Sequence, residues 1–362
     1  MLFPSFRDPD FQSIPLLHAP QVCLAPAPHQ GIAPNNFHAT SNLPEYIHLK
    51  SGWTLVEESR MDAVIVVLED KIKVVEPRTL NAGDMVVVGR TEDGSEGIYV
   101  HANAFTAPEL NDDKFSFKSR GTRETPFSRS YDELYSLLRH DRDYGHIIWV
   151  LGPAVAFDKD SRKAMQGLIE EGYCDALMAG NALATHDLEA ALLGTGLGQD
   201  IYSQKLIPMG HYNHLDIISK VRASGSIEAF LKDHDIDNGI MHACHKTDVP
   251  YLLAGSIRDD GPLPEVISDA YKAQDAMRIH AKKATTVIAM ATQLHSIAFG
   301  NMVPSYMVKK DKSVRPVYFF VVDMSEFSVD KLANRGSAQA QAILTNAQDF
   351  IVNLHNNLKG DK

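Results

Sequence analysis

The stretch from Gly145 to Pro153, GHIIWVLGP, decides the predicted fold. Its run 146–151 is short and apolar, and Gly152-Pro153 ends it, as expected for a strand buried on both faces. Four later runs have the same form, and helix-like segments separate them. The runs are 175–178, 251–253, 286–290 and 317–322, and the segments are 161–171, 188–193, 215–223, 263–283 and 329–333. Short buried strands that alternate with helices are typical of a parallel sheet with helices on both faces, so we predict an α/β domain over residues 146–362.

Small and polar residues follow the predicted strands at their carboxyl ends. In parallel α/β sheets this is the edge where ligands bind, so these residues outline a candidate site. They are Gly152, Gly180-Asn181, Gly255-Ser256, Thr292 and Asp323. An aspartate at such a position either accepts both ribose hydroxyls of an adenosine or caps the next helix, and both roles stay open for Asp323.

Residues 1–145 have a different pattern. Residues 1–44 hold eight of the 18 prolines, a density that forbids a regular helix and predicts an extended arm packed over another part of the chain. Between 45 and 110, β-branched runs alternate with turn formers and predict a small β-domain. The charged segment 111–145 is expected to connect the two domains, with one helix around 131–139.

Composition and charge exclude several classes of protein. Hydrophobic residues make up 44% of the 362 positions, enough apolar material for a substantial core. The net charge of −11 argues against a nucleic-acid partner, which would favour a basic face. No apolar run approaches the roughly 18 residues of a membrane span, and no signal peptide is recognised, so we expect a cytoplasmic protein without a membrane partner. The 3 cysteines form no CxxC pair, which argues against a disulfide framework and a cysteine-rich zinc site.

Two glycine-containing segments are candidates for ligand binding. Gly194-Thr-Gly-Leu-Gly198 follows a predicted helix, so it does not fit the dinucleotide fingerprint; it either cradles a phosphate or ends the helix. The segment 254–264, AGSIRDDGPLP, comes directly after a predicted strand and leads into a helix. That position favours a ligand-binding loop over a merely solvated one.

The histidines form two H-x-x-H pairs. They are His211 with His214 and His242 with His245. Residues three apart on a helix face the same way, but no further carboxylate or histidine stands at a recognised metal spacing, so we predict no metal site. An acid–base or substrate-binding role stays open for them, alongside an ordinary structural one.

The motifs together resemble the LOR/SDH family, also called alternative ornithine cyclodeaminases. This family includes archaeal ornithine cyclodeaminases and the cyclodeaminase half of cyanobacterial arginine dihydrolase fusions. The resemblance extends from about residue 31 to 358 and is dense between 152 and 302. The segments that carry it are 152–155, 172–184, 186–187, 194–198, 239–241, 253–264, 273–278, 294–298 and 300–302. The chain departs from the usual pattern at Met209, where glycine is common, and at His242–Lys246, so its substrate is less closely defined than its cofactor.

The resemblance implies NAD, tightly held by a Rossmann-like domain related to that of deoxyhypusine synthase. It also implies a homo-oligomer, dimer or tetramer, that acts on a small amino acid. The implied cofactor contacts are Asn181, Ala182, Asp260, Thr292, Gln293, Leu294, His295 and Asp323, with Asn346 and Ala347 a weaker match. The strand-end residues Gly152, Gly255 and Ser256 complete the predicted cofactor site.

The implied reaction converts ornithine to proline and ammonia. The α-carbon gives a hydride to NAD+, the distal amine adds to that carbon, ammonia leaves, and the cyclic imine takes the hydride back. Arg258 is our candidate anchor for the substrate carboxylate. Asp260 or His211 is the candidate proton acceptor, and His214 and Lys246 are secondary candidates.

Two other functions stay open. One is an NAD-dependent amino-acid or opine dehydrogenase, which would release NADH as a product. The other is a non-catalytic NAD-binding sensor or scaffold, in which the proline-rich arm docks a partner. A metal-dependent hydrolase built on the paired histidines is a more distant alternative.

Overall fold

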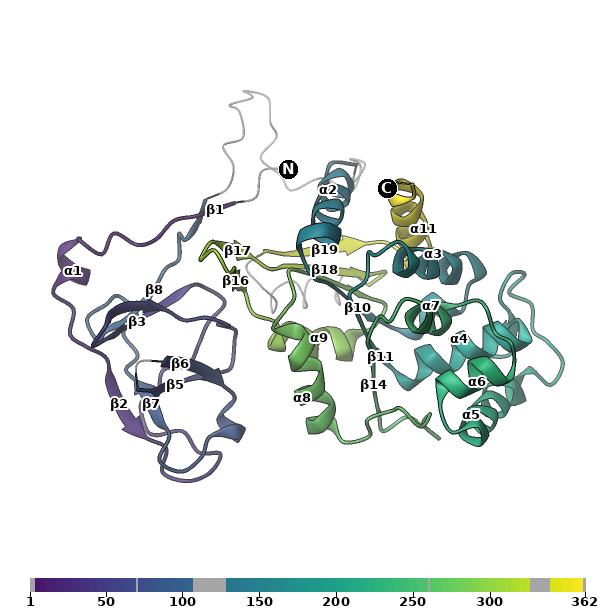
Figure 1. The fold of residues 1–362 in the computed structure, drawn as a ribbon, viewed down its shortest axis with the longest axis horizontal. Helices are drawn as coiled ribbons and strands as arrows, with labels where there is room; N and C mark the ends of the chain where they lie inside the picture. The colour runs from purple at the N-terminus through teal and green to yellow at the C-terminus, as the bar shows by residue number, and fades with distance from the viewer. Residues whose placement is uncertain (1–3, 70, 107–127, 260, 326–338, 361–362) are drawn as a thin grey trace.

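Six parallel strands form the central sheet of the C-terminal part of the molecule (Figure 1). The computed structural model describes residues 4–69, 71–106, 128–259, 261–325 and 339–360. The sheet order is β14-β11-β10-β15-β18-β19, which in order along the chain is the Rossmann arrangement 3-2-1-4-5-6. The strands are β10 (Ile147–Leu151), β11 (Ala176–Gly180), β14 (Tyr251–Ala254), β15 (Thr286–Met290), β18 (Tyr318–Asp323) and β19 (Gln339–Leu344). The predicted α/β fold is therefore confirmed.

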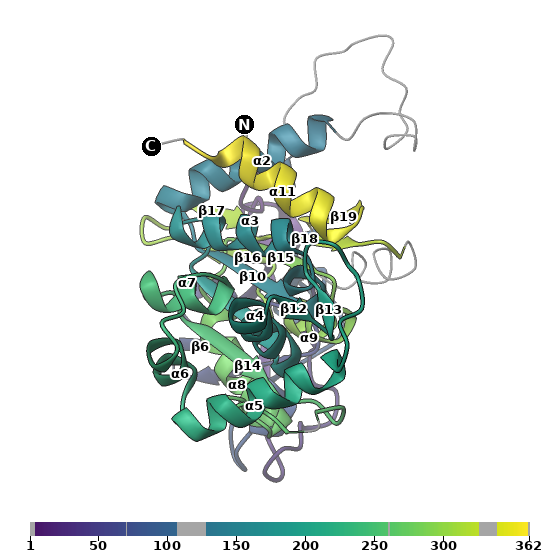
Figure 2. The same ribbon diagram turned by 90° about the vertical axis from the view of Figure 1, so that its right-hand side faces the viewer.

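Helices cover both faces of this sheet, as the two views in Figures 1 and 2 show. Alternate residues of β10 point to opposite cores: Trp149 lies in one hydrophobic cluster and Ile148 in the other, both with no exposed surface. The first cluster is covered by α2 (Ser128–Tyr144), α3 (Lys159–Glu170), α4 (Asn181–Leu193), α5 (Asn213–Ser224), α6 (Ile227–Asp233), α7 (Ile240–Lys246) and α11 (Ala347–Leu358). The second is covered by α8 (Ala270–Ala281) and α9 (Gln293–Met302).

Two of these helices differ from the predicted ranges. α8 begins at Ala270 rather than near 263, because the two prolines at 262 and 264 prevent an earlier start and Asp269 caps the helix through the Lys272 amide at 2.8 Å. α4 begins at Asn181, directly after β11, rather than at 188. The helix expected at 329–333 lies outside the described residues.

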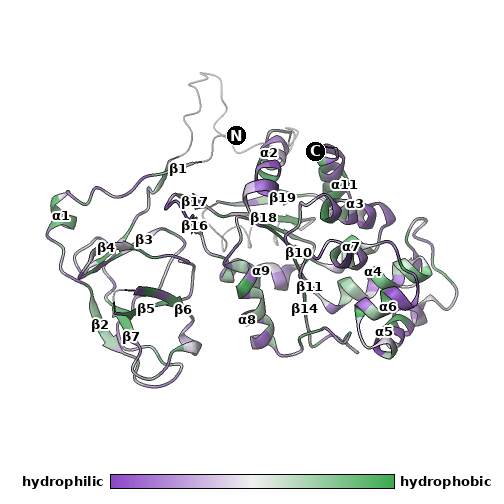
Figure 3. Ribbon diagram, in the orientation of Figure 1, coloured by the Kyte–Doolittle hydropathy of each residue, from purple (hydrophilic) through white to green (hydrophobic). Residues whose placement is uncertain are grey.

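The β-rich part consists of two small antiparallel sheets that enclose a shared core. Their orders are β2-β7-β5-β6 and β4-β3-β8. Ile47 and Ile98 from one sheet pack with Ile65 and Val87 from the other, and none of the four has exposed surface. Figure 3 shows this apolar interior as green along β5. The strands are β3 (Glu45–Leu49), β4 (Gly52–Leu55), β5 (Val64–Leu68), β6 (Lys71–Val75), β7 (Met85–Val88) and β8 (Ile98–Val100).

The proline-rich arm packs on this β-rich part. Its strand β2 (Cys23–Pro26) pairs with β7, and β1 (Ser5–Phe6) pairs with β9 (Phe105–Thr106). The Trp53 indole donates to the Leu16 carbonyl of α1 (Ile14–Leu17) at 3.1 Å.

The predicted domain boundaries near residues 44, 110 and 145 stay predictions. The remaining short elements are η1 (Pro77–Thr79), η2 (Pro153–Ala156), η3 (Gly210–Tyr212), β12 (Thr195–Gly196), β13 (Gln199–Asp200), β16 (Tyr306–Val308) and β17 (Val314–Pro316).

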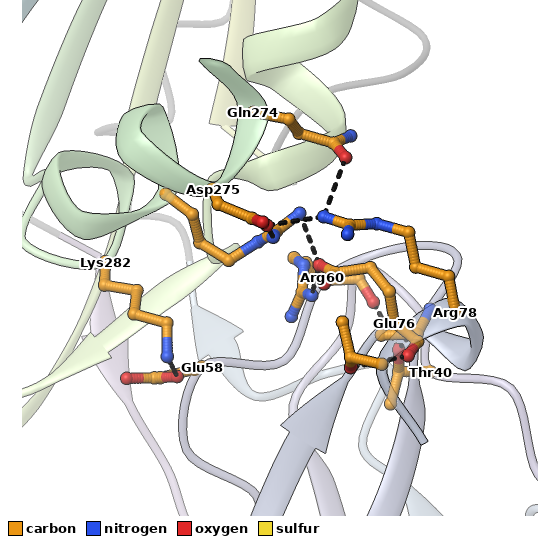
Figure 4. A network of polar contacts seen from close by, with 11 residues as sticks. Thr40, Glu58, Arg60, Glu76, Arg78, Gln274, Asp275 and Lys282 are labelled. Carbon is orange, nitrogen blue, oxygen red and sulfur yellow. Dashed lines mark hydrogen bonds and ion pairs between the residues drawn. The ribbon is translucent and has the colours of Figure 1, made fainter. Parts of the chain in front are cut away.

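A network of ion pairs joins the β-rich part to α8 (Figure 4). Glu76 lies at its centre and pairs with Arg60 of its own part and with Arg278 of α8. Arg78 pairs with Asp275, and its guanidinium lies 5.1 Å from the Tyr271 ring. The Arg60 and Arg278 side chains are only 5% and 11% exposed, so Glu76 supplies the counter-charge of two largely buried cations.

Replacing Glu76 by Gln is expected to lower the free energy of unfolding by about 1–3 kcal/mol, because two buried guanidinium groups lose a charged partner. Urea unfolding of the purified variant measures the loss. Lys232→Ala is the control, since it breaks an exposed Lys232–Glu228 pair on α6 and should leave unfolding unchanged. Equal stability of the Glu76 variant and the control would show that the network does not hold the two parts together.

Candidate functional site

The backbone of β10 and the residue after β15 come unusually close at the carboxyl edge of the sheet. The Gly152 amide donates to the Met290 carbonyl at 2.9 Å. A Cβ atom at position 152 would lie 1.9 Å from the Ala291 carbonyl oxygen, so only glycine fits. Ala291 itself has a φ of +56°, a left-handed conformation that costs a non-glycine residue energy. This is the switch point between β10 and β15, where Rossmann sheets open a crevice for a dinucleotide.

Two helix N-termini face the same edge. α4 begins after Gly180 and α9 after Thr292, and neither capping residue accepts a side-chain hydrogen bond from a backbone amide of its helix. The His295 ring of α9 lies against Gly180, where a Cβ would be 2.9 Å from the ring carbon Cε1. Free amide groups at helix N-termini favour anions such as a pyrophosphate. The predicted residues Asn181, Ala182, Gln293 and Leu294 form the first turns of these two helices.

The loop after β14 is held over this edge by backbone contacts. The Asn181 side-chain oxygen accepts from the Leu263 amide at 3.0 Å, and the Gly255 amide donates to the Ile267 carbonyl at 2.9 Å. The Ser256 amide donates to Asp259 at 2.8 Å. Arg258 is exposed, and its guanidinium makes no ion pair within the described part of the chain. Asp260 lies outside the described residues.

His295 is a buried titratable group at this edge of the sheet. Burial lowers the pKa of its imidazole, and the nearby Asp259 carboxylate opposes that shift only in part. Its Nδ1 lies 3.4 Å from the Thr292 hydroxyl. A neutral ring at this position can donate or accept a hydrogen bond without placing a positive charge in the crevice.

Asp323 and Asn346 follow the next two strands along the same edge. Asp323 ends β18 next to Ala291, whose amide donates to the Val322 carbonyl at 3.1 Å, and one carboxylate oxygen accepts from the Ser325 amide at 2.9 Å. Asn346 caps α11 by accepting from the Asp349 amide at 2.7 Å, and Ala347 is the first residue of that helix.

The predicted catalytic residues that the structure describes lie on different elements. His211 and His214 lie in η3 and at the start of α5; His211 is exposed with its ring 4.3 Å from that of Tyr212. Lys246 lies at the end of α7, just before β14 begins, and pairs with Glu170 at 3.1 Å. It is therefore at the amino edge of the sheet, and the structure does not bring it together with the other candidates.

A buried pair on α4 was not among the candidates predicted from the sequence. His186 Nδ1 lies 2.7 Å from a carboxylate oxygen of Glu189, and the two residues are 6% and 0% exposed. The His186 ring packs edge-on against Phe157 at 5.0 Å and lies 6.1 Å from the His214 ring. The signal available in the sequence was an H-x-x-E spacing inside an otherwise apolar helix.

The glycine-rich segment 194–198 packs beside this pair. Gly194 ends α4 with a φ of +68°, as a helix stop does. Gly198 has a φ of +74°, and a Cβ there would lie 2.7 Å from the Gly210 backbone, so this glycine lets the two loops touch. The segment therefore ends α4 and gives Glu189 hydrogen-bond donors. It does not join a strand to a following helix, as a dinucleotide-binding loop does.

Comparison with known proteins identifies the family of the chain. Residues 133–354 match the family described as arginine dihydrolase ArgZ-like, C-terminal, Rossmann fold, and residues 44–124 match the first region of the same C-terminal part. The chain belongs to this ArgZ-like family. An ornithine cyclodeaminase from Methanopyrus kandleri is 39% identical over 346 residues, which is 95% of this chain and 80% of that protein. The predicted family resemblance is therefore confirmed.

Solved structures agree with this membership in the ArgZ-like family. A LOR/SDH protein from Methanococcus maripaludis is similar, with a TM-score of 0.83 and 34% identity over 94% of this chain and 98% of that one. AgrE in a ternary complex with ornithine and NAD+ has a TM-score of 0.59 and 29% identity, over 94% of this chain and 46% of that one. Within the described ranges, no helix is both long and apolar enough to cross a bilayer, and no group of three metal-ligating side chains is found.

Proposed function

We propose that this ArgZ-like chain is an NAD-dependent ornithine cyclodeaminase that converts ornithine to proline and ammonia. The observation that carries the proposal is its 39% identity to an archaeal ornithine cyclodeaminase over nearly its whole length. AgrE, which has the same fold, binds both ornithine and NAD+. The carboxyl edge of the sheet has the close backbone approach at Gly152 and two helix N-termini without a side-chain cap, which suit a dinucleotide.

The residues of that edge fit NAD. Gly152 permits the close backbone approach, and the first turns of α4 and α9 offer amide donors to the pyrophosphate. We assign Asp323 to the adenosine ribose. When bound, NAD supplies a hydride acceptor that returns the hydride later in the same turnover.

The protein's own task is to hold the substrate and move its protons. We assign Arg258 to the substrate carboxylate, since its guanidinium is unpaired in the described chain and follows β14 at the ligand edge. Binding both ends of ornithine bends it, so that the distal amine comes within reach of the α-carbon. Over one turnover, one proton passes from the δ-nitrogen to the α-nitrogen, which leaves as ammonium.

The proposal is tested by denaturing the purified protein to identify any released nucleotide by mass, and by incubating native protein with ornithine. We expect NAD together with equimolar proline and ammonia and no net NADH. Net NADH would identify the dehydrogenase instead, and bound NAD without turnover of any amino acid would identify the sensor.

Arg258→Ala is expected to lower kcat/KM for ornithine about 10- to 150-fold, mainly through KM, because a charge-assisted carboxylate contact contributes about 1.5–3 kcal/mol. Steady-state kinetics with proline detection measures the change. Arg90→Ala, an exposed arginine in the β-rich part, is the matched control. An Arg258 variant with the wild-type KM contradicts the carboxylate assignment.

We also propose that the enzyme is a cytoplasmic homo-oligomer, dimer or tetramer. Support comes from exposed apolar side chains on the segment 197–209, where Leu197, Tyr202, Leu206 and Met209 are 56–79% exposed. Light scattering on the purified protein tests the assembly.

A further inference from the structure

The Glu189 carboxylate on α4 is saturated with hydrogen-bond donors. One oxygen accepts from the Thr195 hydroxyl at 2.7 Å and the Gly198 amide at 3.2 Å. The other accepts from the Leu197 amide at 3.3 Å and lies 2.7 Å from His186 Nδ1. Burial raises the pKa of Glu189, but the hydrogen bonds from His186, Thr195 and Gly198 outweigh burial and hold the pKa below its ordinary value. Glu189 is therefore an ionised group that only accepts hydrogen bonds.

An ionised Glu189 determines the tautomer of His186. Because the carboxylate has no proton to give, His186 Nδ1 carries the hydrogen of this contact, and Nε2 is the ring nitrogen left to exchange a proton with another group. Nε2 makes no hydrogen bond within the described part of the chain. A histidine oriented in this way by a carboxylate is the arrangement of an enzymatic acid–base group.

The His186–Glu189 pair lies next to the carboxyl edge of the sheet, where we propose that the ligands bind. His186 is five residues after Asn181, so it is about 7.5 Å further along the axis of α4. Its ring packs on Phe157, which directly follows η2, and η2 begins just after Gly152. Among the described residues, His214 also faces the ring, whereas Asp187 pairs with Arg162 at 2.6 Å.

We propose that His186 is the residue that transfers protons between the substrate nitrogens and that Glu189 is its positioning residue. This proposal rests on the cyclodeaminase function proposed above. Both substrate nitrogens react as neutral amines. After the δ-nitrogen has added to the α-carbon, Nε2 takes a proton from the δ-nitrogen and gives one to the α-nitrogen, which departs as ammonia. One N–H bond breaks at the δ-nitrogen and one forms at the α-nitrogen, and His186 returns to the protonation state in which it began.

His186 fits a proton-transfer role better than the histidines predicted from the sequence. His211 is exposed, and no carboxylate partner orients its ring within the described residues. His186 is nearly enclosed, with 6% exposed, so its ring is shielded from bulk water. The geometry of the pair does not depend on a flexible loop, because α4 carries both members three residues apart.

The test compares His186→Gln and Glu189→Gln with His234→Gln, a control histidine that follows α6 and is partly exposed. We expect His186→Gln to lower kcat about 10²- to 10⁴-fold while KM and NAD retention stay within threefold of wild type. Glu189→Gln should lower kcat less and shift the pH profile of kcat, because the ring loses its orienting charge. Imidazole added to His186→Ala should restore part of the activity, which a purely structural role would not allow.

The possible outcomes separate this assignment from the proposed function. If the wild type converts ornithine to proline and His186→Gln is equally active, the assignment of His186 is overturned but the proposed function stands. If His186→Gln loses both NAD retention and its thermal unfolding transition, and imidazole does not rescue His186→Ala, the pair has a structural role. That result also overturns the assignment of His186 as the proton-transfer residue. A wild-type chain that makes no proline overturns the proposed function and this assignment together.

Discussion

Asp141→Asn is expected to lower the free energy of unfolding by about 3–5 kcal/mol, the cost of breaking a buried ion pair from one side. The Asp141 carboxylate has no exposed surface and binds the Arg315 guanidinium through two hydrogen bonds of 2.8 and 3.1 Å. It also accepts from the Thr285 and Thr286 hydroxyls at 2.7 and 2.8 Å. One side chain thereby joins α2, β15 and β17, and asparagine would leave the buried guanidinium beside a neutral amide.

The effect of this substitution depends on pH. Burial raises the pKa of Asp141, but hydrogen bonds and charge from Arg315, together with His140 and Thr285, hold it below its ordinary value. The folded state thus favours the ionised form, and the stabilisation is complete above about pH 5 and lost as pH falls through the lowered pKa. Urea unfolding at pH 7 and at about pH 3 should show a smaller difference between wild type and variant at the lower pH.

Asp143→Asn is the matched control for Asp141. It lies on the same helix, and its carboxylate pairs with Arg142 in a 53% exposed position. We expect no measurable loss of stability from it. An Asp141 variant that loses less than about 1 kcal/mol contradicts the structural account of this network.

Gly152→Ala is expected to weaken NAD binding at least 100-fold, which corresponds to about 2.7 kcal/mol. The added Cβ would lie 1.9 Å from the Ala291 carbonyl oxygen, so the two strand ends must move apart. A movement of about 1 Å is enough to misplace the groups that hold a ligand. Calorimetric titration of the NAD-free protein with NAD measures the affinity.

Gly83→Ala is the control for this substitution. Gly83 lies in a turn of the β-rich part with a φ of +90°, and an added Cβ there would meet no atom within 4 Å. Alanine should therefore cost stability through its backbone conformation without affecting NAD binding. NAD bound equally well by Gly152→Ala and wild type would show that the cofactor does not use the β10–β15 crevice.

The ligand edge could be predicted from the sequence because strand ends follow a simple rule. Buried apolar runs locate parallel strands. The residues that follow these strands meet at one edge of the sheet, whatever the order of the strands within it. Gly152, Asn181, Thr292 and Asp323 were placed correctly at that edge for this reason. The strand order itself was not predicted, because several orders bury the same runs equally well.

The His186–Glu189 pair could not be predicted by the same rule. Both residues lie inside a helix, where a polar side chain in the sequence usually faces solvent. Their burial results from the segment 194–210, which folds back against the end of α4 so that Thr195 and Gly198 contact Glu189. Likewise, the position of Lys246 at the opposite edge depends on α7 ending before β14 begins, a boundary that the sequence marks weakly.

Ornithine that carries deuterium and nitrogen-15 at the α-position distinguishes internal recycling of the hydride from its release. We expect proline with deuterium still on the α-carbon and ordinary nitrogen in the ring, together with nitrogen-15 ammonium. Deuterium in a free reduced nicotinamide pool, or nitrogen-15 in the proline ring, would contradict this expectation.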